Sequence, residues 1–327
     1  PYIYKTTDFG KTWSTITAGI PKEEFVRVVR ADPKRQGLLY AGTEKGIWIS
    51  FDDGASWNKF QLNLPPVPIA DLAVKNDNLI AATHGRSFWM IDDLTPLHQL
   101  SKEMASKETI LYKPMPTYRM PSQGGYREPK KGDGENHPGG VMVHYFMKTL
   151  DEKSEVKLEF LEANGSIIKT FSTKSKEKSE LITIKVGGNR FVWDMRHPGY
   201  KTFPGMVFYG SPNSGPKAVP GKYKVRLTAN GQTQEQEFEI LKDPRISTTQ
   251  QEFQGQLDFL VKVRDKVSEA NQGVIDIRKI KDDLGSLKNK LVSEIQFKEL
   301  LDAVKKFEDE LTQHENNIHQ TKNRSVQ

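Results

Sequence analysis

Short segments in which apolar and polar residues alternate dominate the first hundred residues. Such alternation is the pattern of half-buried β-strands, and it predicts strands at residues 2–5, 25–33, 38–43, 46–50, 69–77, 79–83 and 87–91. The pattern repeats, because Trp48 and Trp89 occupy corresponding places 41 residues apart. A period of about 40 to 45 residues built from short strands predicts blades of a β-propeller, each with about four strands.

A sequence motif follows two of these strands. TTDFGKTW at 6–13 and SFDDGASW at 50–57 share the pattern Ser/Thr-x-Asp-x-Gly-x-Ser/Thr-Trp, and their aspartates are 44 residues apart. The glycine permits a turn with positive φ, the aspartate accepts hydrogen bonds from N–H groups across that turn, and the tryptophan fills the space between neighbouring sheets. We therefore interpret eight residues as structural: Thr6, Asp8, Gly10, Trp13, Ser50, Asp52, Gly54 and Trp57.

The repeat changes at residues 90–97. Asp92 and Asp93 are present, but the glycine and the tryptophan of the motif are missing, and the residues that follow predict a turn or a short helix. A propeller needs about four blades or more, and residues 1–97 supply fewer than three. We assign residues 1–110 to the C-terminal blades of a propeller and expect the remaining blades to come from the same protein or from another chain.

The middle of the chain contains a linker and a second β-rich region. Residues 111–140 are rich in Pro and Gly and predict an extended linker. Residues 141–242 alternate again, and two Asn-Gly pairs predict tight hairpin turns. Strands at this regular spacing favour an Ig-like or fibronectin-like β-sandwich of about 100 residues. We expect Trp193 and Tyr223 in its core and Asp194 at a bend.

Residues 243–327 are predicted to be helical. Apolar residues recur at steps of three and four from Phe253 onward, and Thr248 or Thr249 is suited to cap the first turn. Residues 282–287 are expected to break the helix, so that two amphipathic helices form an antiparallel hairpin. The predicted fold class is therefore mainly β, with partial propeller blades, a β-sandwich and then an α-helical hairpin.

Four segments together resemble a known bacterial family. They are LLYAGTEKGIWISFDDGASW (38–57), LIAATHGRSFWMIDDLTPL (79–97), GGNRFVWDMRHPG (187–199) and PGKYKVRLTANG (220–231). They resemble the BNR or Asp-box propeller proteins, which are glycosyl-hydrolase-related and sortilin-like or xyloglucanase-like. The resemblance covers essentially the whole chain and implies the C-terminal part of such a protein. It also implies export to the periplasm, the cell surface or the medium.

Composition narrows the function classes. The 327 residues contain no Cys, which excludes disulfides, thiolate metal sites and a Cys nucleophile. The net charge is +6, with 21 Lys and Arg against 14 Asp and Glu in residues 111–242. These cations are scattered singly and no nucleic-acid-binding motif is present, so we expect no nucleic-acid partner. No apolar run predicts a transmembrane segment, and the first residues lack the pattern of a signal peptide.

Catalytic candidates are few. A glycosidase needs two carboxylates on either side of a sugar, and the candidates in the first hundred residues are Glu23, Glu24, Glu44, Asp71, Asp92 and Asp93. Their spacing pairs none of them. A sialidase-type set of Arg, Tyr and Glu residues is also not assembled by any motif. We therefore identify no catalytic residue from the sequence.

Two residues are candidates for ligand binding. His84 and Arg86 lie in THGRSFW on a predicted turn, where they would suit an anionic ligand, although a hydrogen-bonding role within the turn is the favoured alternative. The seven histidines are dispersed, and DGEN at 133–136 lacks the spacing of an EF-hand. We expect neither a metal nor a cofactor.

The sequence thus predicts a non-catalytic binding or scaffold region of an exported β-propeller protein, with a glycan or a protein as its ligand. The alternative is part of a glycoside hydrolase whose catalytic carboxylates lie largely in N-terminal blades outside this chain. A sortilin-like peptide receptor is a third reading, which the absence of Cys weakens because that class is held together by disulfides. The helical hairpin is expected to serve in interactions rather than catalysis.

Overall fold

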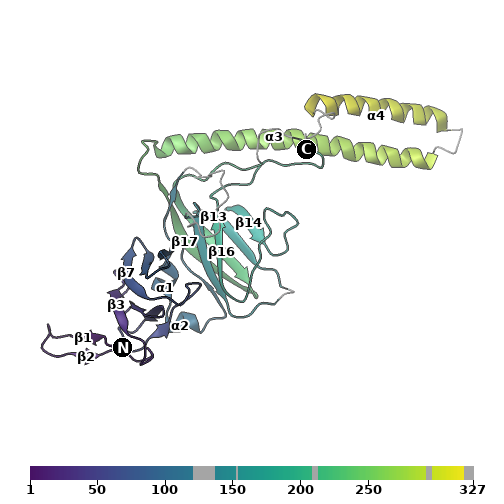
Figure 1. Ribbon diagram of the computed structural model, residues 1–327. Coiled ribbons are helices and arrows are strands. Elements are labelled where there is room, and N and C mark those ends of the chain that lie inside the picture. Colours follow the sequence, from purple (N-terminus) through teal and green to yellow (C-terminus); the bar gives the residue numbers. More distant parts are fainter. Residues whose placement is uncertain (121–136, 152–153, 208–212, 292–296, 320–327) are drawn as a thin grey trace.

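The computed structural model describes residues 1–120, 137–151, 154–207, 213–291 and 297–319. It contains several small antiparallel sheets, a curled five-stranded sheet and two C-terminal helices that pack together (Figure 1). The calcium-site candidate at residues 133–136 lies outside the described residues. None of the described helices is long and apolar enough to span a membrane.

Three small antiparallel sheets form the N-terminal part. The first pairs β1 (Tyr4–Lys5) with β2 (Ser14–Thr15). The second has the order β3 (Val26–Ala31), β4 (Leu39–Thr43), β5 (Ile47–Ser50) and β6 (Asn58–Lys59). The third has the order β7 (Ile69–Lys75), β8 (Asn78–Thr83) and β9 (Phe88–Ile91). The second and third sheets share one core, in which Tyr40 and Ile69 are fully buried.

Two further sheets follow the short helices α1 (Thr95–Gln99) and α2 (Lys102–Ala105). One is antiparallel, with the order β10 (Thr109–Leu111), β12 (Val141–Met147) and β15 (Gly187–Trp193). The other curls around the core, with the order β11 (Thr117–Arg119), β17 (Gln232–Lys242), β16 (Gly221–Ala229), β13 (Lys157–Glu162) and β14 (Ile167–Ser172). The strand β11 runs parallel to β17 and lies in the segment that the sequence predicts as a linker.

The core between these two sheets is rich in aromatic rings. Trp193 is fully buried and stacks on Phe160, with 4.4 Å between the ring centroids. The hydroxyl of Tyr223 donates a 2.7 Å hydrogen bond to the carbonyl of Val219. Asp194 lies at the exposed bend after β15, where it accepts a 3.1 Å hydrogen bond from the N–H of Arg196.

The first C-terminal helix, α3 (Gln250–Leu291), starts at a capping box formed by Thr249 and Glu252. The predicted break at residues 282–287 is wrong, because α3 continues through them. The only strong helix breaker in that segment is Gly285, and one glycine costs a helix only about 1 kcal/mol relative to Ala. That cost is small beside the packing of a helix 42 residues long.

The second helix, α4 (Lys298–Ile318), runs antiparallel to the distal half of α3 (Figure 1). Glu315 is nearly buried between Arg278 and Lys281 of α3, at 2.7 Å and 3.2 Å. Nearer the far end of the pair, Lys288 lies 2.7 Å from Glu308. The predicted pairing of two C-terminal helices is therefore confirmed.

Candidate ligand-binding cleft

A cleft of about 700 Å³ separates the N-terminal sheets from the three-stranded sheet β10–β12–β15. Residues of the N-terminal part form one wall: Phe60, Leu62, Ile91, Asp93, Pro96 and Leu97. The other wall contains Tyr112, His144, Tyr145, Phe146, Thr183, Ile184, Lys185, Gly188, Asn189 and Arg190. Its volume is within the range of about 300 to 1,000 Å³ that is typical of small-molecule sites.

Strand register aligns the key side chains on the sheet wall. The N–H of Tyr112 donates a 3.0 Å hydrogen bond to the carbonyl of His144, and His144 is directly opposite Arg190 in β15. Directly opposed residues in antiparallel strands point to the same face of the sheet. The phenol, the imidazole and the guanidinium therefore form one row across the sheet. In the next row, Gly188 faces Phe146 and leaves open space where a side chain would lie.

Asp93 faces this row from the other wall. It lies between β9 and α1, and its Oδ1 accepts a 2.8 Å hydrogen bond from the N–H of Thr95. Its side chain is only 2% exposed, and Oδ2 lies 3.1 Å from Nε2 of His144. Both atoms are shielded from solvent, and neither forms a hydrogen bond of good geometry with a described residue.

The environment of Asp93 favours its ionised form. Burial alone opposes ionisation and is the largest influence. The imidazole of His144 and the hydrogen bonds from Thr95 outweigh it, so the pKa of Asp93 lies below its usual value. Asp93 is therefore ionised near neutral pH.

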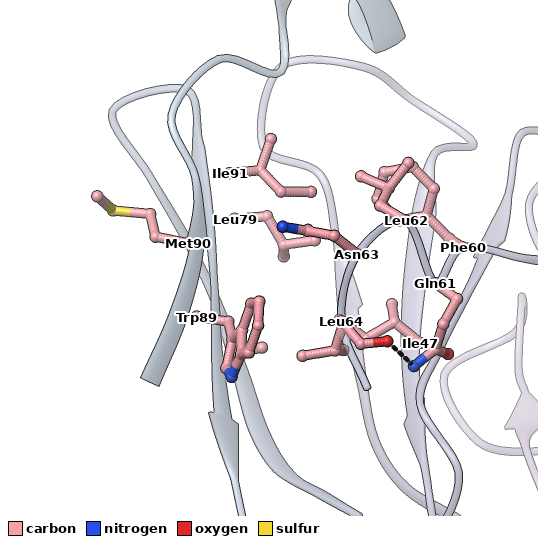
Figure 2. A pocket seen from close by; sticks show the side chains of 11 residues that line it. Ile47, Phe60, Gln61, Leu62, Asn63, Leu64, Leu79, Trp89, Met90 and Ile91 are labelled. Atoms are coloured by element: carbon pink, nitrogen blue, oxygen red, sulfur yellow. Dashed lines mark hydrogen bonds between the residues drawn. The ribbon is translucent and has the colours of Figure 1, made fainter. Parts of the chain in front are cut away.

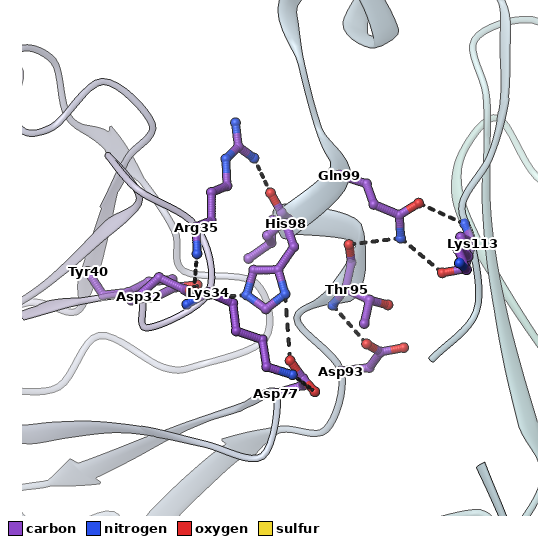
Figure 3. Close-up of polar contacts among 11 residues, drawn as sticks. Asp32, Lys34, Arg35, Tyr40, Asp77, Asp93, Thr95, His98, Gln99 and Lys113 are labelled. Carbon is purple, nitrogen blue, oxygen red and sulfur yellow. Dashed lines mark hydrogen bonds and ion pairs between the residues drawn. The ribbon is translucent and has the colours of Figure 1, made fainter. Parts of the chain in front are cut away.

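A polar network fixes α1 and thereby the position of Asp93 (Figure 3). Nε2 of His98 lies 2.9 Å from Oδ2 of Asp32, which also accepts a 3.1 Å hydrogen bond from the hydroxyl of Tyr40. Burial opposes ionisation of Asp32, but His98 and two backbone N–H groups outweigh it and lower its pKa. The side chain of Gln99 bonds both the N–H and the carbonyl of Lys113, at 2.8 Å and 2.9 Å. This last contact joins α1 to the segment that follows β10.

A smaller cavity of about 40 Å³ lies beside the cleft, between β5 and the strands β8 and β9 (Figure 2). Its lining is mostly apolar and includes Leu79, Trp89 and Ile91. The side-chain amide of Gln61 points toward the backbone and donates a 2.8 Å hydrogen bond to the carbonyl of Leu64. A liquid water takes about 30 Å³, so this space suits a packing gap rather than a ligand.

The two predicted ligand-binding residues lie outside the cleft. His84 and Arg86 are exposed on the turn between β8 and β9, and neither side chain makes a hydrogen bond or ion pair with the described residues. Their backbones support the turn, since the N–H of His84 donates to Pro68 and the carbonyl of Arg86 accepts from the indole of Trp89. The structure does not bring them together with the row of Tyr112, His144 and Arg190.

Of the six carboxylates considered for catalysis, Asp93 alone lines the cleft. Glu24 is buried and accepts hydrogen bonds from Thr43 and Trp48, at 2.9 Å and 3.1 Å. Asp71 forms an ion pair with Arg30 at 2.6 Å, and Glu44 forms one with Arg27. Glu23 is exposed and Asp92 is half-buried. No second carboxylate among the lining residues opposes Asp93. Within the described ranges, no group of three or more His, Asp or Glu side chains is placed to hold a metal.

The two repeated motifs have the same hydrogen-bond geometry. The hydroxyl of Thr6 donates to Asp8 at 2.9 Å, and that of Ser50 donates to Asp52 at 2.8 Å. The N–H groups of Gly10 and Gly54 donate to these same hydroxyl oxygens, at 2.8 Å and 2.9 Å.

Their tryptophans differ. Trp57 is 3% exposed and is covered by residues that follow the first motif, including Ile16 and Ile20. Trp13 is 60% exposed, and its indole bonds only the carbonyl of Gly10. The sequence motif is thus the same in both copies, but among the described residues only the tryptophan of the second copy is covered.

Sequence reasoning missed the row in the cleft. Tyr112 falls at the start of the predicted linker, because β10 is too short to show a period. His144 and Arg190 lie on the polar face of predicted strands, and only the register between β12 and β15 pairs them. The sequence indicates only that His144 and Arg190 are polar positions within alternating segments.

Comparisons with known proteins do not assign the chain to a family. No protein-family model matches the chain, and neither does any curated protein. Among solved structures, the chain is similar to the extracellular domain of the hybrid two-component system BT4673 from B. thetaiotaomicron. The two are 9% identical with a TM-score of 0.22, and the match covers 72% of this chain. The chain spans 27% of that structure's length.

Proposed function

We propose that this chain is a non-catalytic binding and scaffold region of an exported β-propeller protein. Its ligand, a glycan or a protein, binds in the cleft between the last blade and an Ig-like β-sandwich. The observation that carries this proposal is the composition of the cleft. Aromatic and cationic side chains line it, and Asp93 is the single carboxylate among its described lining residues, whereas glycoside hydrolysis ordinarily requires two.

The two motifs support the propeller part of the proposal. In each, the same hydrogen bonds hold the same turn, as expected for consecutive blades. Residues beside the hairpin of β1 and β2, including Ile16 and Ile20, cover Trp57, as a neighbouring blade would. The exposed aromatic residues on that first hairpin would in turn be covered by a preceding blade: Tyr2, Tyr4, Phe9 and Trp13.

A screen of the chain against arrays of glycans and peptides tests this function. Gly188→Phe is the variant that fills the cleft, because a Cβ at Gly188 meets nothing within 4 Å. We expect a ligand that binds the native chain and loses binding to Gly188→Phe, with an unchanged melting temperature. Arg86→Ala, on the exposed turn, is the matched control and should bind normally.

Two results would contradict the proposal. One is the absence of any ligand whose binding depends on Gly188. The other is release of reducing ends from a bound glycan that stops when Asp93 is replaced by Asn, which would favour the glycoside hydrolase alternative. In that case the second carboxylate would come from blades outside this chain.

A further inference from the structure

Resting on the proposed function, we propose that the cleft binds an acidic saccharide, in which a sugar ring carries a carboxylate. The carboxylate lies against Arg190, and the sugar ring lies against the aromatic side chains of the two walls. Two features of the cleft support this ligand class: its unpaired cations and its aromatic walls.

The cations of the cleft lack acidic partners. Arg190 and Lys185 are exposed on the sheet wall, and within the described ranges neither forms an ion pair. By contrast, Arg226 in β16 is held by Glu159 and Glu235. A guanidinium binds a carboxylate well because its planar donors match the two oxygens. The row that contains Arg190 is therefore ready to accept an anionic group.

The carboxylate of Asp93 orients the ligand by its charge. Its Oδ2 lies 3.1 Å from Nε2 of His144, and both atoms are shielded from solvent, so they join the two walls rather than contact the ligand. The ionised Asp93 repels a second carboxylate. The acid of the ligand therefore lies toward Arg190 and away from Asp93.

Aromatic rings on both walls suit a sugar ring. Phe60 comes from the N-terminal part, whereas Tyr112 and Phe146 come from the three-stranded sheet, and all three are half-buried. Amphipathic rings bury one face against such surfaces and keep their polar edges available. Rings on both walls suit a ligand whose carboxylate is attached to a ring, whereas the carboxylate of an acidic peptide lies on a flexible side chain, so we favour the saccharide.

Calorimetric titration of the full chain with trigalacturonic acid, and with galactotriose as the neutral probe, tests this assignment. We expect the acidic trimer to bind and the neutral trimer to bind at least about tenfold more weakly, since the neutral trimer lacks a charge-assisted hydrogen bond. Arg190→Gln should weaken binding of the acidic trimer by about the same factor and leave the neutral one unchanged. Arg86→Gln is the control and should change neither.

The outcomes separate this inference from the proposed function. If galactotriose binds as tightly as the acidic trimer and Gly188→Phe abolishes both, the cleft is a binding site but the acidic class is wrong. If neither trimer binds while a Glu-rich peptide binds in a Gly188-dependent manner, the saccharide class is wrong. If no glycan or peptide probe shows Gly188-dependent binding, the inference and the proposed function both fail.

Discussion

The imidazole of His144 and the carboxylate of Asp93 lie 3.1 Å apart across the cleft, although they belong to different parts of the chain. His144 is held in the middle of β12, and Asp93 is held by the backbone at the start of α1. This contact and the bonds between Gln99 and Lys113 join the N-terminal sheets to the three-stranded sheet. The walls of the cleft therefore depend on polar contacts as well as on packing.

Ionisation of Asp93 should make stability depend on pH. Its pKa in the folded chain is lowered from 3.8, so its stabilising contribution is complete above that value and is lost as the pH falls through the folded pKa. We expect Asp93→Asn to unfold with a smaller change in stability between pH 5 and pH 2 than the native chain. Urea denaturation at each pH measures this. Asp71→Asn, at an exposed ion pair, should keep the native pH dependence, and an equal slope for Asp93→Asn would contradict the assignment.

The two motif tryptophans should differ in their effect on stability. Trp57→Ala removes a buried ring and should lower the free energy of unfolding by about 3 to 5 kcal/mol. Trp13→Ala removes an exposed ring from the isolated chain and should change it by about 0.5 kcal/mol or less. Thermal melts of the two variants compare these effects directly. Similar losses for both would show that the segment after β2 does not cover Trp57.

Gly285 tests the continuity of α3. Space around its Cα is open, and Ala is better than Gly within a helix by about 1 kcal/mol. Gly285→Ala should therefore raise stability by about that amount, as measured by chemical denaturation. A loss of stability would indicate that residues 282–287 form a turn after all.

Glu315 should contribute to docking of α4 on α3. Its side chain is 5% exposed and is bonded by Arg278 and Lys281. Glu315→Ala leaves both cations without this partner and should cost about 1.5 to 3 kcal/mol, the range for hydrogen bonds to charged groups. Hydrogen exchange in α4 should become faster. Glu269→Ala, at a pair exposed to solvent, should leave the exchange of α4 unchanged, and equal effects of the two variants would disprove the role of Glu315.

Most strands could be predicted from the sequence, because apolar and polar residues alternate with a period of two wherever one face of a strand is buried. The helix start was also predicted, with Thr248 or Thr249 as the cap, and the structure has the capping box at Thr249. The predicted break at residues 282–287 gave too much weight to Gly285. Local breakers have little effect when the flanking turns pack against a second helix.

The cleft was beyond sequence reasoning for a different reason. It requires the register between β12 and β15, which places His144 beside Arg190 from 46 residues away. It also requires the docking of α1, which brings Asp93 to that row through His98 and Gln99. Neither the register of distant strands nor the docking of a five-residue helix leaves a periodic pattern in the sequence.

The position of the bound ligand tests the central claim most directly. We would titrate the isotope-labelled chain with trigalacturonic acid and follow its backbone amide signals. The account predicts shifts at Asp93, His144 and Arg190, with no change at His84 and Arg86 on the exposed turn. Shifts confined to that turn, or no shift at the cleft while the ligand binds elsewhere, would contradict it.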